Sequence, residues 1–135
     1  MRNQSNVCRV LVVDGQGGGI GSQLVKLLRS CLPENCELIG VGTNVLATNA
    51  MLKAGATYGA TGENPVIVNA QDADIIIGPI GIVMANSLLG EITPAMATAI
   101  GISKAYKILI PVNRCNHYVV GCQNSTLSDY INMVC

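Results

Sequence analysis

The glycine-rich run Asp14-Gly15-Gln16-Gly17-Gly18-Gly19-Ile20-Gly21 is the part of the sequence best suited to binding a ligand. Glycine allows positive φ angles and lets a backbone approach a pyrophosphate closely, while free N–H groups at a helix start stabilise the phosphate charge. The alternative is that these glycines only permit a tight turn between a strand and a closely packed helix. The run therefore indicates either a phosphate-binding loop or a compact turn.

Three of these glycines, Gly15, Gly19 and Gly21, have the spacing G-x-x-x-G-x-G, which is similar to the fingerprint of short-chain dehydrogenases. Other features depart from that family. Asp14 would repel a phosphate unless it points away, binds a cation or caps backbone N–H groups. The second expected strand ends in Thr43-Asn44 instead of the acidic residue that holds an adenosine ribose. There is no Tyr-x-x-x-Lys catalytic pair and no Walker lysine in the loop, so dehydrogenase chemistry and a Walker site are not expected.

Other polar residues follow later strands, among them Glu63, Asn86 and Glu91. The two glutamates would be candidate general bases or metal ligands if they met in space. Residues in such positions more often cap helices. No catalytic residue is therefore assigned.

Cysteines near the carboxyl end of the chain suggest two further possibilities. Cys115 follows Arg114, whose positive charge favours a reactive thiolate. Cys115, His117 and Cys122 form the pattern Cys-x-His-x4-Cys, which matches no familiar zinc spacing. We therefore expect no metal site.

The elements that position these residues alternate between strand and helix. Thr43 or Asn44 can cap the helix expected over 46–54. A mixed pattern at 80–90 fits either helix or loop. We expect a further strand over Tyr118–Cys122, paired with the strand before it. The main expected strands are 8–13, 37–42, 56–61, 74–78 and 107–112, and the main expected helices are 20–31, 46–54, 64–72, 94–102 and 126–134.

The central strands are apolar throughout, which is typical of parallel strands covered on both faces. The expected fold class is α/β, a Rossmann-like, doubly wound, mostly parallel sheet in a single domain over 1–135, with a flexible start at 1–7. In such sheets ligands bind beyond the carboxyl ends of the strands. The expected cofactor-binding residues are Asp14, Gly15, Gln16, Gly17, Gly18, Gly19, Ile20, Gly21, Thr43, Asn44, Gly78 and Pro79.

The composition restricts the partners. Charged residues make up only 12% of the chain, the net charge is zero, and no basic stripe is present, so we expect no nucleic acid partner. The low charge predicts a homo-oligomer, most simply a dimer, using the face Ala47, Ala50 and Ala54 and the apolar stretch 80–89. No apolar run is long enough to span a membrane, and we expect a cytoplasmic protein whose six cysteines are free thiols.

Several strings along the chain together resemble a family of short bacterial proteins known only as a domain of unknown function, number 3842. The resemblance covers Val10 to Val120 and implies a Rossmann-like, single-domain protein without implying an activity. Besides the glycine-rich run, the strings are Gly42-Thr43-Asn44, Gly59-Ala60-Thr61-Gly62-Glu63-Asn64, Asp74-Ile75-Ile76-Ile77-Gly78-Pro79-Ile80-Gly81-Ile82 and Gly90-Glu91-Ile92-Thr93-Pro94-Ala95-Met96-Ala97.

These observations favour a small binding protein or sensor for a phosphate-bearing cofactor, either NAD or NADP or an adenine nucleotide. One alternative is an enzyme whose site is assembled between subunits, with Glu63, Glu91, Asn86 or Cys115 supplying the chemistry. Another is a structural or regulatory oligomer whose loop is only a turn.

Overall fold

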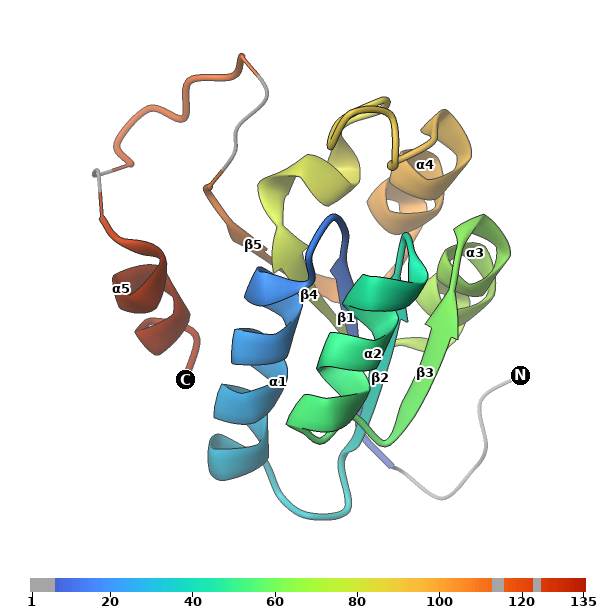
Figure 1. The fold of residues 1–135 in the computed structure, drawn as a ribbon, viewed down its shortest axis with the longest axis vertical. Coiled ribbons are helices and arrows are strands. Elements are labelled where there is room, and N and C mark those ends of the chain that lie inside the picture. Colours follow the sequence, from blue (N-terminus) through green and yellow to red (C-terminus); the bar gives the residue numbers. More distant parts are fainter. Residues whose placement is uncertain (1–6, 113–115, 123–124) are drawn as a thin grey trace.

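A five-stranded, all-parallel sheet forms the centre of the molecule (Figure 1). The computed structural model describes residues 7–112, 116–122 and 125–135. The strands lie in the order β3-β2-β1-β4-β5, so the chain runs outward from β1 in one direction and then in the other. This is the doubly wound Rossmann-like arrangement that the sequence predicts. The strands are β1 (Arg9–Asp14), β2 (Glu37–Gly42), β3 (Tyr58–Thr61), β4 (Ile75–Pro79) and β5 (Tyr106–Ile110).

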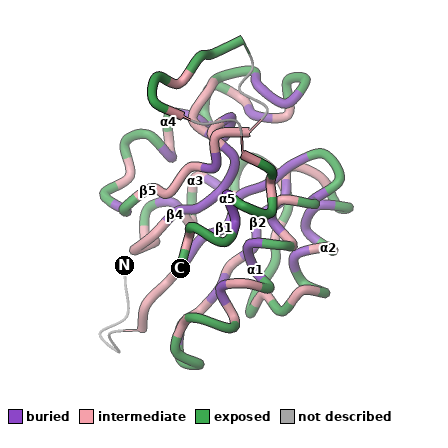
Figure 2. The backbone as a smooth tube through the Cα atoms, turned by 90° about the vertical axis from the view of Figure 1, so that its left-hand side faces the viewer, coloured by how far each residue is buried: buried purple, intermediate pink, exposed green. Residues whose placement is uncertain are grey.

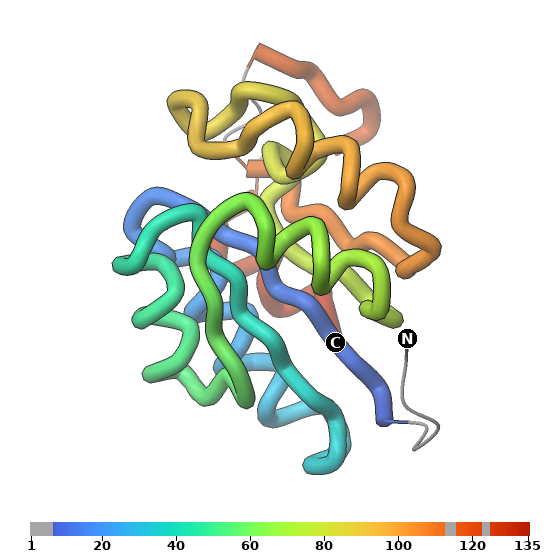
Figure 3. The backbone as a smooth tube through the Cα atoms, turned by 90° about the vertical axis from the view of Figure 1, so that its right-hand side faces the viewer, coloured from blue at the N-terminus to red at the C-terminus, as the bar shows by residue number. Residues whose placement is uncertain are grey.

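Helices cover both faces of this sheet. One face carries α1 (Gly19–Cys31) and α2 (Val45–Ala54), and α3 (Glu63–Asp72) and α4 (Pro94–Ile102) cover the other, which faces the viewer in Figure 3. Alternate residues of β1 belong to the two cores: Val10 and Val12 pack on the first face, and Leu11 and Val13 on the second.

The central strand has no solvent-facing side. From Val10 to Asp14 every residue of β1 is buried, and Figure 2 shows the buried colour along this central part of the sheet. A strand with cores on both faces is apolar throughout instead of alternating. The structure thus confirms the reading of the apolar runs as covered parallel strands.

Local capping signals start the helices close to their expected positions. The side chain of Asn44 accepts a hydrogen bond from Ala47 N at 2.9 Å and begins α2, which ends at Gly55 with φ 120°. Thr93 accepts from Met96 N at 3.1 Å and begins α4, with proline in the first turn. These side chains satisfy N–H groups that have no partner within the helix.

Two segments differ from or refine the expectation. The ambiguous stretch 80–90 is a short 3₁₀ helix (Ile80–Val83) followed by turns. The strand expected over Tyr118–Cys122 is wrong: the segment is a turn, closed by Cys122 N donating to Val119 O at 3.2 Å. Gly121 has φ 82° and Val120 is 86% exposed, so neither the backbone conformation nor the burial fits a strand paired with β5.

The expectation of six free thiols is also wrong, because Cys31 and Cys135 form a disulfide with a Cα–Cα distance of 6.4 Å. The last helix, α5 (Leu127–Asn132), lies beside α1, so the end of the chain reaches the end of α1 (Figure 1). Tyr130 and Ile131 of α5 are buried in the core on that face. The sequence predicts a free thiol at Cys31, and no local pattern indicates a partner 104 residues away.

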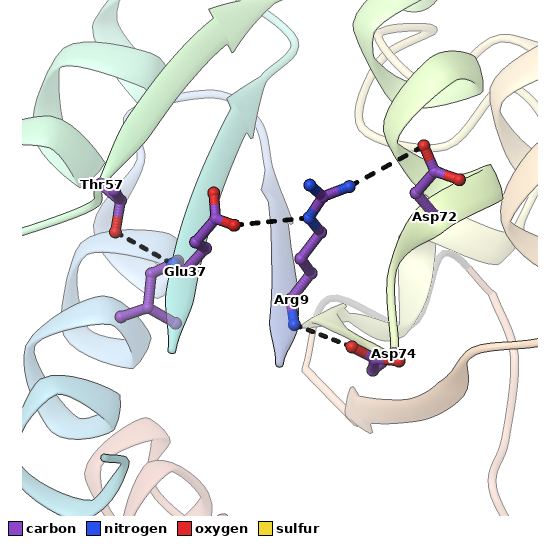
Figure 4. Close-up of polar contacts among 6 residues, drawn as sticks. Arg9, Glu37, Thr57, Asp72 and Asp74 are labelled. Carbon is purple, nitrogen blue, oxygen red and sulfur yellow. Dashed lines mark hydrogen bonds and ion pairs between the residues drawn. The ribbon is translucent and has the colours of Figure 1, made fainter. Parts of the chain in front are cut away.

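Charged side chains meet at the amino ends of the strands (Figure 4). Arg9 of β1 pairs with Glu37 of β2 at 3.5 Å and with Asp72 of α3 at 4.0 Å, and its backbone N–H donates to Asp74 at 2.8 Å. These contacts align β1 with its neighbours at one edge of the sheet. The carboxyl edge, where the glycine-rich run lies, is built differently.

None of the helices in the described part of the chain has the length and apolar character needed to cross a membrane.

The disulfide yields a prediction about stability. Replacing Cys135 by Ser removes a crosslink that closes a loop of about 100 residues, and should lower the free energy of unfolding by about 2–4 kcal/mol because the unfolded chain gains freedom. Peptide mapping of unreduced protein should find Cys31 joined to Cys135. Denaturant titration of the wild type under reducing conditions should match the variant, and equal stability with and without reductant would contradict the disulfide.

Candidate functional site

The candidate site lies at the carboxyl ends of β1 and β4, where the strand order changes direction. Beyond this point a parallel sheet leaves a crevice, because the connections from the two strands leave toward opposite faces. The glycine-rich run connects β1 to α1 at this edge, and Pro79 ends β4 beside it. A pocket of about 160 Å³ opens between them, lined by Asp14, Gly15, Gln16, Gly17, Gly18, Gly19, Ile20, Pro79, Leu88 and Leu127.

Three glycines of the run are required by the packing of the protein itself. A Cβ on Gly15 would lie 2.7 Å from both Glu91 Oε1 and Thr43 Oγ1. Gly18 has φ 77°, and a Cβ there would lie 2.7 Å from Ala47 Cα of α2. A Cβ on Gly21 would lie 2.8 Å from Asp14 Cβ. These positions fit the compact-turn interpretation, in which glycine allows close approach of strand and helices.

Gly17 and Gly19 are different. Both are exposed, neither has a positive φ, and a Cβ on either would meet no atom within 4 Å. Among the described residues no acceptor binds the N–H of Gly17 or of Gly19. Neither packing nor backbone conformation requires glycine at these two positions, so their backbone is open to a group that approaches from outside.

Asp14 is turned inward and serves the first turn of α1. It is 3% exposed, and its carboxylate accepts a hydrogen bond from Gly21 N at 2.6 Å. The residue at the helix start, Gly18, has no side chain to make this contact. Of the three roles considered for Asp14, the structure shows the capping of backbone N–H groups.

Burial raises the pKa of Asp14 above its ordinary value of 3.8, since the ionised form loses water. Hydrogen bonds from the backbone of Gly21 and Gly15 oppose this shift, and the nearby negative charge of Glu91 adds to it. The site thus contains a carboxylate whose ionised form is disfavoured by burial and partly stabilised by backbone hydrogen bonds.

Glu91 crosses the carboxyl edge to join β1 and β2. Its Oε1 accepts from Gln16 N at 2.7 Å and from Thr43 Oγ1 at 2.8 Å, and its Oε2 accepts from Asn44 Nδ2 at 3.2 Å. Partial burial would raise the pKa of Glu91, but the hydrogen bonds from Gln16, Thr43 and Asn44 outweigh it and lower the pKa below the ordinary 4.5. Glu91 is therefore an ionised acceptor at neutral pH.

The segment that carries Glu91 has an uncommon backbone. Asn86, Leu88 and Leu89 have φ angles of 65°, 54° and 56°, and Gly90 has φ 87°. Left-handed conformations cost non-glycine residues about 1–3 kcal/mol each and persist only where other contacts hold them. Leu88 is buried against the loop, whereas Leu89 is 97% exposed. The strained segment brings Leu88 over the pocket and Glu91 to the end of β2.

The other expected residues divide into those at the site and those away from it. Thr43 and Asn44 belong to the Glu91 network. Gly78 lies beneath the site, where a Cβ would collide with Val13 O, and it does not line the pocket. Glu63 is exposed in the first turn of α3, and within the described residues no hydrogen bond joins it to Glu91.

Three of the remaining candidates fall outside this arrangement. Asn86 is exposed in the strained segment. Arg114 and Cys115 lie outside the described residues. In the parts of the chain that the structure describes, no group of three or more His, Cys, Asp or Glu side chains could hold a metal ion.

The contact between Glu91 and the end of β2 was missed by sequence reasoning, which noted Thr43-Asn44 as the absence of an acidic residue. The carboxylate comes from a residue 48 positions later in the chain. The position of Glu91 just before α4 suggested that it caps this helix, but the cap is Thr93. No local signal could have shown the contact.

The raised pKa of Asp14 predicts how stability depends on pH. The folded chain holds this proton more tightly than the unfolded chain, so the contribution is complete below pH 3.8 and is lost as pH rises through the folded pKa. Asp14→Asn keeps an oxygen acceptor for Gly21 N but does not titrate. The free energy of unfolding of the variant minus that of the wild type should therefore rise between pH 3 and pH 7 in denaturant titrations. A difference that stays constant or falls would show that Asp14 is not destabilised by burial.

Comparison with known proteins identifies a family and assigns no chemistry to the site. No match was found among curated proteins. The family described as Domain of unknown function (DUF3842) matches residues 9–135, which includes every element of the sheet and the whole glycine-rich run. The chain belongs to the DUF3842 family.

Proposed function

We propose that this protein is a small binding protein or sensor for a nucleotide, of the NAD or adenine-nucleotide class, whose phosphate groups contact the backbone at Gly17 and Gly19. The observation that carries the proposal is the openness of these two positions. Gly15, Gly18 and Gly21 are explained by packing, whereas Gly17 and Gly19 are not. A ligand that needs the space of the missing Cβ atoms accounts for glycine there.

The donors at these positions suit a phosphate. The N–H groups of Gly17 and Gly19 lie at the start of α1, where the helix dipole favours negative charge. The pocket of about 160 Å³ is smaller than the roughly 300–1,000 Å³ that encloses a whole drug-sized ligand. It fits a diphosphate, with the remainder of the nucleotide lying along the open edge of the sheet.

The charges at the site limit the affinity. Asp14 and Glu91 both carry carboxylates near the loop, and among the residues that the structure describes the pocket lining includes no Lys, Arg or His. In this described part of the site a phosphate is stabilised by backbone N–H groups and is opposed by the negative charge of the nearby carboxylates. This arrangement favours reversible binding, as a sensor requires, over tight retention of a cofactor.

Substituting Gly19 by Val tests the loop directly. The branched side chain fills the space where the phosphate approaches, so affinity for NAD or ATP should fall about tenfold or more, which is about 1.4 kcal/mol. Calorimetry with NAD, NADP and ATP measures the effect. A Cβ at Gly19 would meet no atom, and the residue has no positive φ, so the Gly19→Val variant should fold. Its free energy of unfolding should differ from that of the wild type by less than about 1 kcal/mol.

Two control variants separate ligand contact from folding. Gly101→Val makes the same chemical change at another exposed glycine without Cβ contacts, in α4, and should leave affinity unchanged. Gly18→Val should destabilise the fold, because its side chain would collide with Ala47 of α2. Wild type that binds none of the three nucleotides at millimolar concentration would overturn the proposal, as would unchanged binding by folded Gly19→Val.

We also propose that the chain self-associates, although not through the face expected. Ala47 and Ala50 lie against Gly18 at the start of α1, so that small-residue face is used inside the fold. Large apolar side chains on α2 and β3 are exposed instead, including Leu46 at 72% and Tyr58 at 57%. Covering such residues favours a closed dimer.

Leu46→Lys tests this assembly. Sedimentation of the wild type at micromolar concentration should give a species larger than the 14.0 kDa chain, and the variant should shift it toward monomer, because a charge would be buried in the interface. A wild type that sediments as a monomer would contradict the dimer.

The cytoplasmic location expected from the sequence is opposed by one observation. Disulfides are rare in reducing compartments, so the Cys31–Cys135 bond argues against this location. In protein taken directly from its cells, free thiols at Cys31 and Cys135 would support a reducing compartment, and an intact bond would contradict it.

A further inference from the structure

We propose that Glu91 selects the sugar of the bound nucleotide, by accepting a hydrogen bond from a free ribose hydroxyl and by excluding a ribose that carries a phosphate. The inference rests on the nucleotide-binding function proposed above. It names the ligand as one of the NAD or adenosine type, with unmodified ribose hydroxyls, and not of the NADP type.

The position of the carboxylate supports this role. When a nucleotide places its phosphates at the start of α1, its adenosine ribose lies toward the end of the second strand. Glu91 reaches this place from the far side of β1 and contacts Thr43 and Asn44, which directly follow β2. It also contacts Gln16 N, next to the proposed phosphate contact at Gly17. The carboxylate thus lies between the loop and the end of β2.

The hydrogen bonds around Glu91 leave it able to accept one more. A carboxylate offers about four lone-pair positions, two on each oxygen. Oε1 accepts from Gln16 N and Thr43 Oγ1, and Oε2 accepts from Asn44 Nδ2. A position on Oε2 remains for a donor from outside. Glu91 is half-buried, and its carboxylate is held in place before a ligand arrives.

The charge around Glu91 decides between a hydroxyl and a phosphate. Among the described residues, the donors that contact it are a backbone N–H, a hydroxyl and an amide, and none of them is a Lys or Arg side chain. A phosphate on the ribose would meet a carboxylate that no cation of the described residues compensates, and like charges in a partly buried site repel strongly. A hydroxyl instead donates to the ionised acceptor.

Glu91 has no competing structural task at the helix that follows it. The start of α4 is capped by Thr93, which accepts from Met96 N. The segment before Glu91 nevertheless adopts left-handed conformations at Leu88 and Leu89 that bring this side chain across the edge of the sheet. Unfavourable backbone conformations are concentrated at sites of function.

The test is the ratio of the affinities for NAD and NADP, measured by calorimetry on three proteins. The wild type should bind NAD at least tenfold more tightly than NADP. Glu91→Gln removes the charge while keeping the size of the side chain. The affinities of this variant for NAD and NADP should differ by no more than about threefold, chiefly because NADP binds more tightly than it does to the wild type. Glu34→Gln removes the same charge from an exposed turn between α1 and β2, and should keep the wild-type ratio.

The outcomes separate this inference from the function on which it rests. Failure of the wild type to bind either nucleotide overturns the proposed function and the selection with it. Equal binding of both by the wild type, or tighter binding of NADP, overturns the selection alone. An equal increase in the affinities for NAD and NADP in the Glu91→Gln variant would also overturn the selection, because Glu91 would then act only as a general repulsive charge.

Discussion

A buried hydrogen bond, from the backbone N–H of Gly21 to the carboxylate of Asp14, joins the central strand to the first helix. It sets where α1 starts and in which direction it leaves β1. Gly21 must be glycine because Asp14 lies directly against it, and Gly18, which precedes the helix, has no side chain that could cap it. The remaining loop residues, Gly17 and Gly19, are then held at the surface with their backbone exposed.

The second part of the site is built from distant segments. Glu91 ties the loop at Gln16 to the end of β2, and Leu88 from the same segment packs over Gly15. Both contacts cross the edge of the sheet at the place where a doubly wound fold leaves a crevice. The two carboxylates stabilise the loop by accepting hydrogen bonds from its N–H groups. Under the proposed function, the same carboxylates oppose an anion that binds beside them, so we expect nucleotide binding to be reversible.

Much of the fold could be predicted because each element carries a local signal. Asn44 and Thr93-Pro94 start helices by capping, Gly55 ends one, and apolar runs such as Ile75–Ile77 indicate strands covered on both faces. The false strand at Tyr118–Cys122 arose from β-branched residues that tertiary packing does not use, and Val120 is exposed. The Cys31–Cys135 bond and the Glu91 contacts join residues far apart in the chain, and no local pattern encodes them. The glycine spacing located the loop, but only Cβ contacts separated glycines needed for packing from those left open.

The most direct measurement is a titration of ¹⁵N-labelled protein with NAD, followed by the backbone amide signals in NMR spectra. If nucleotide binds at this loop, the largest shifts should occur at Gly17 and Gly19, the two loop amides that have no acceptor among the described residues. The amide of Gly101, an equally open glycine in α4, should not move. Saturating shifts confined to other surfaces, or none at millimolar NAD, would contradict the claim that this loop is a nucleotide-binding site.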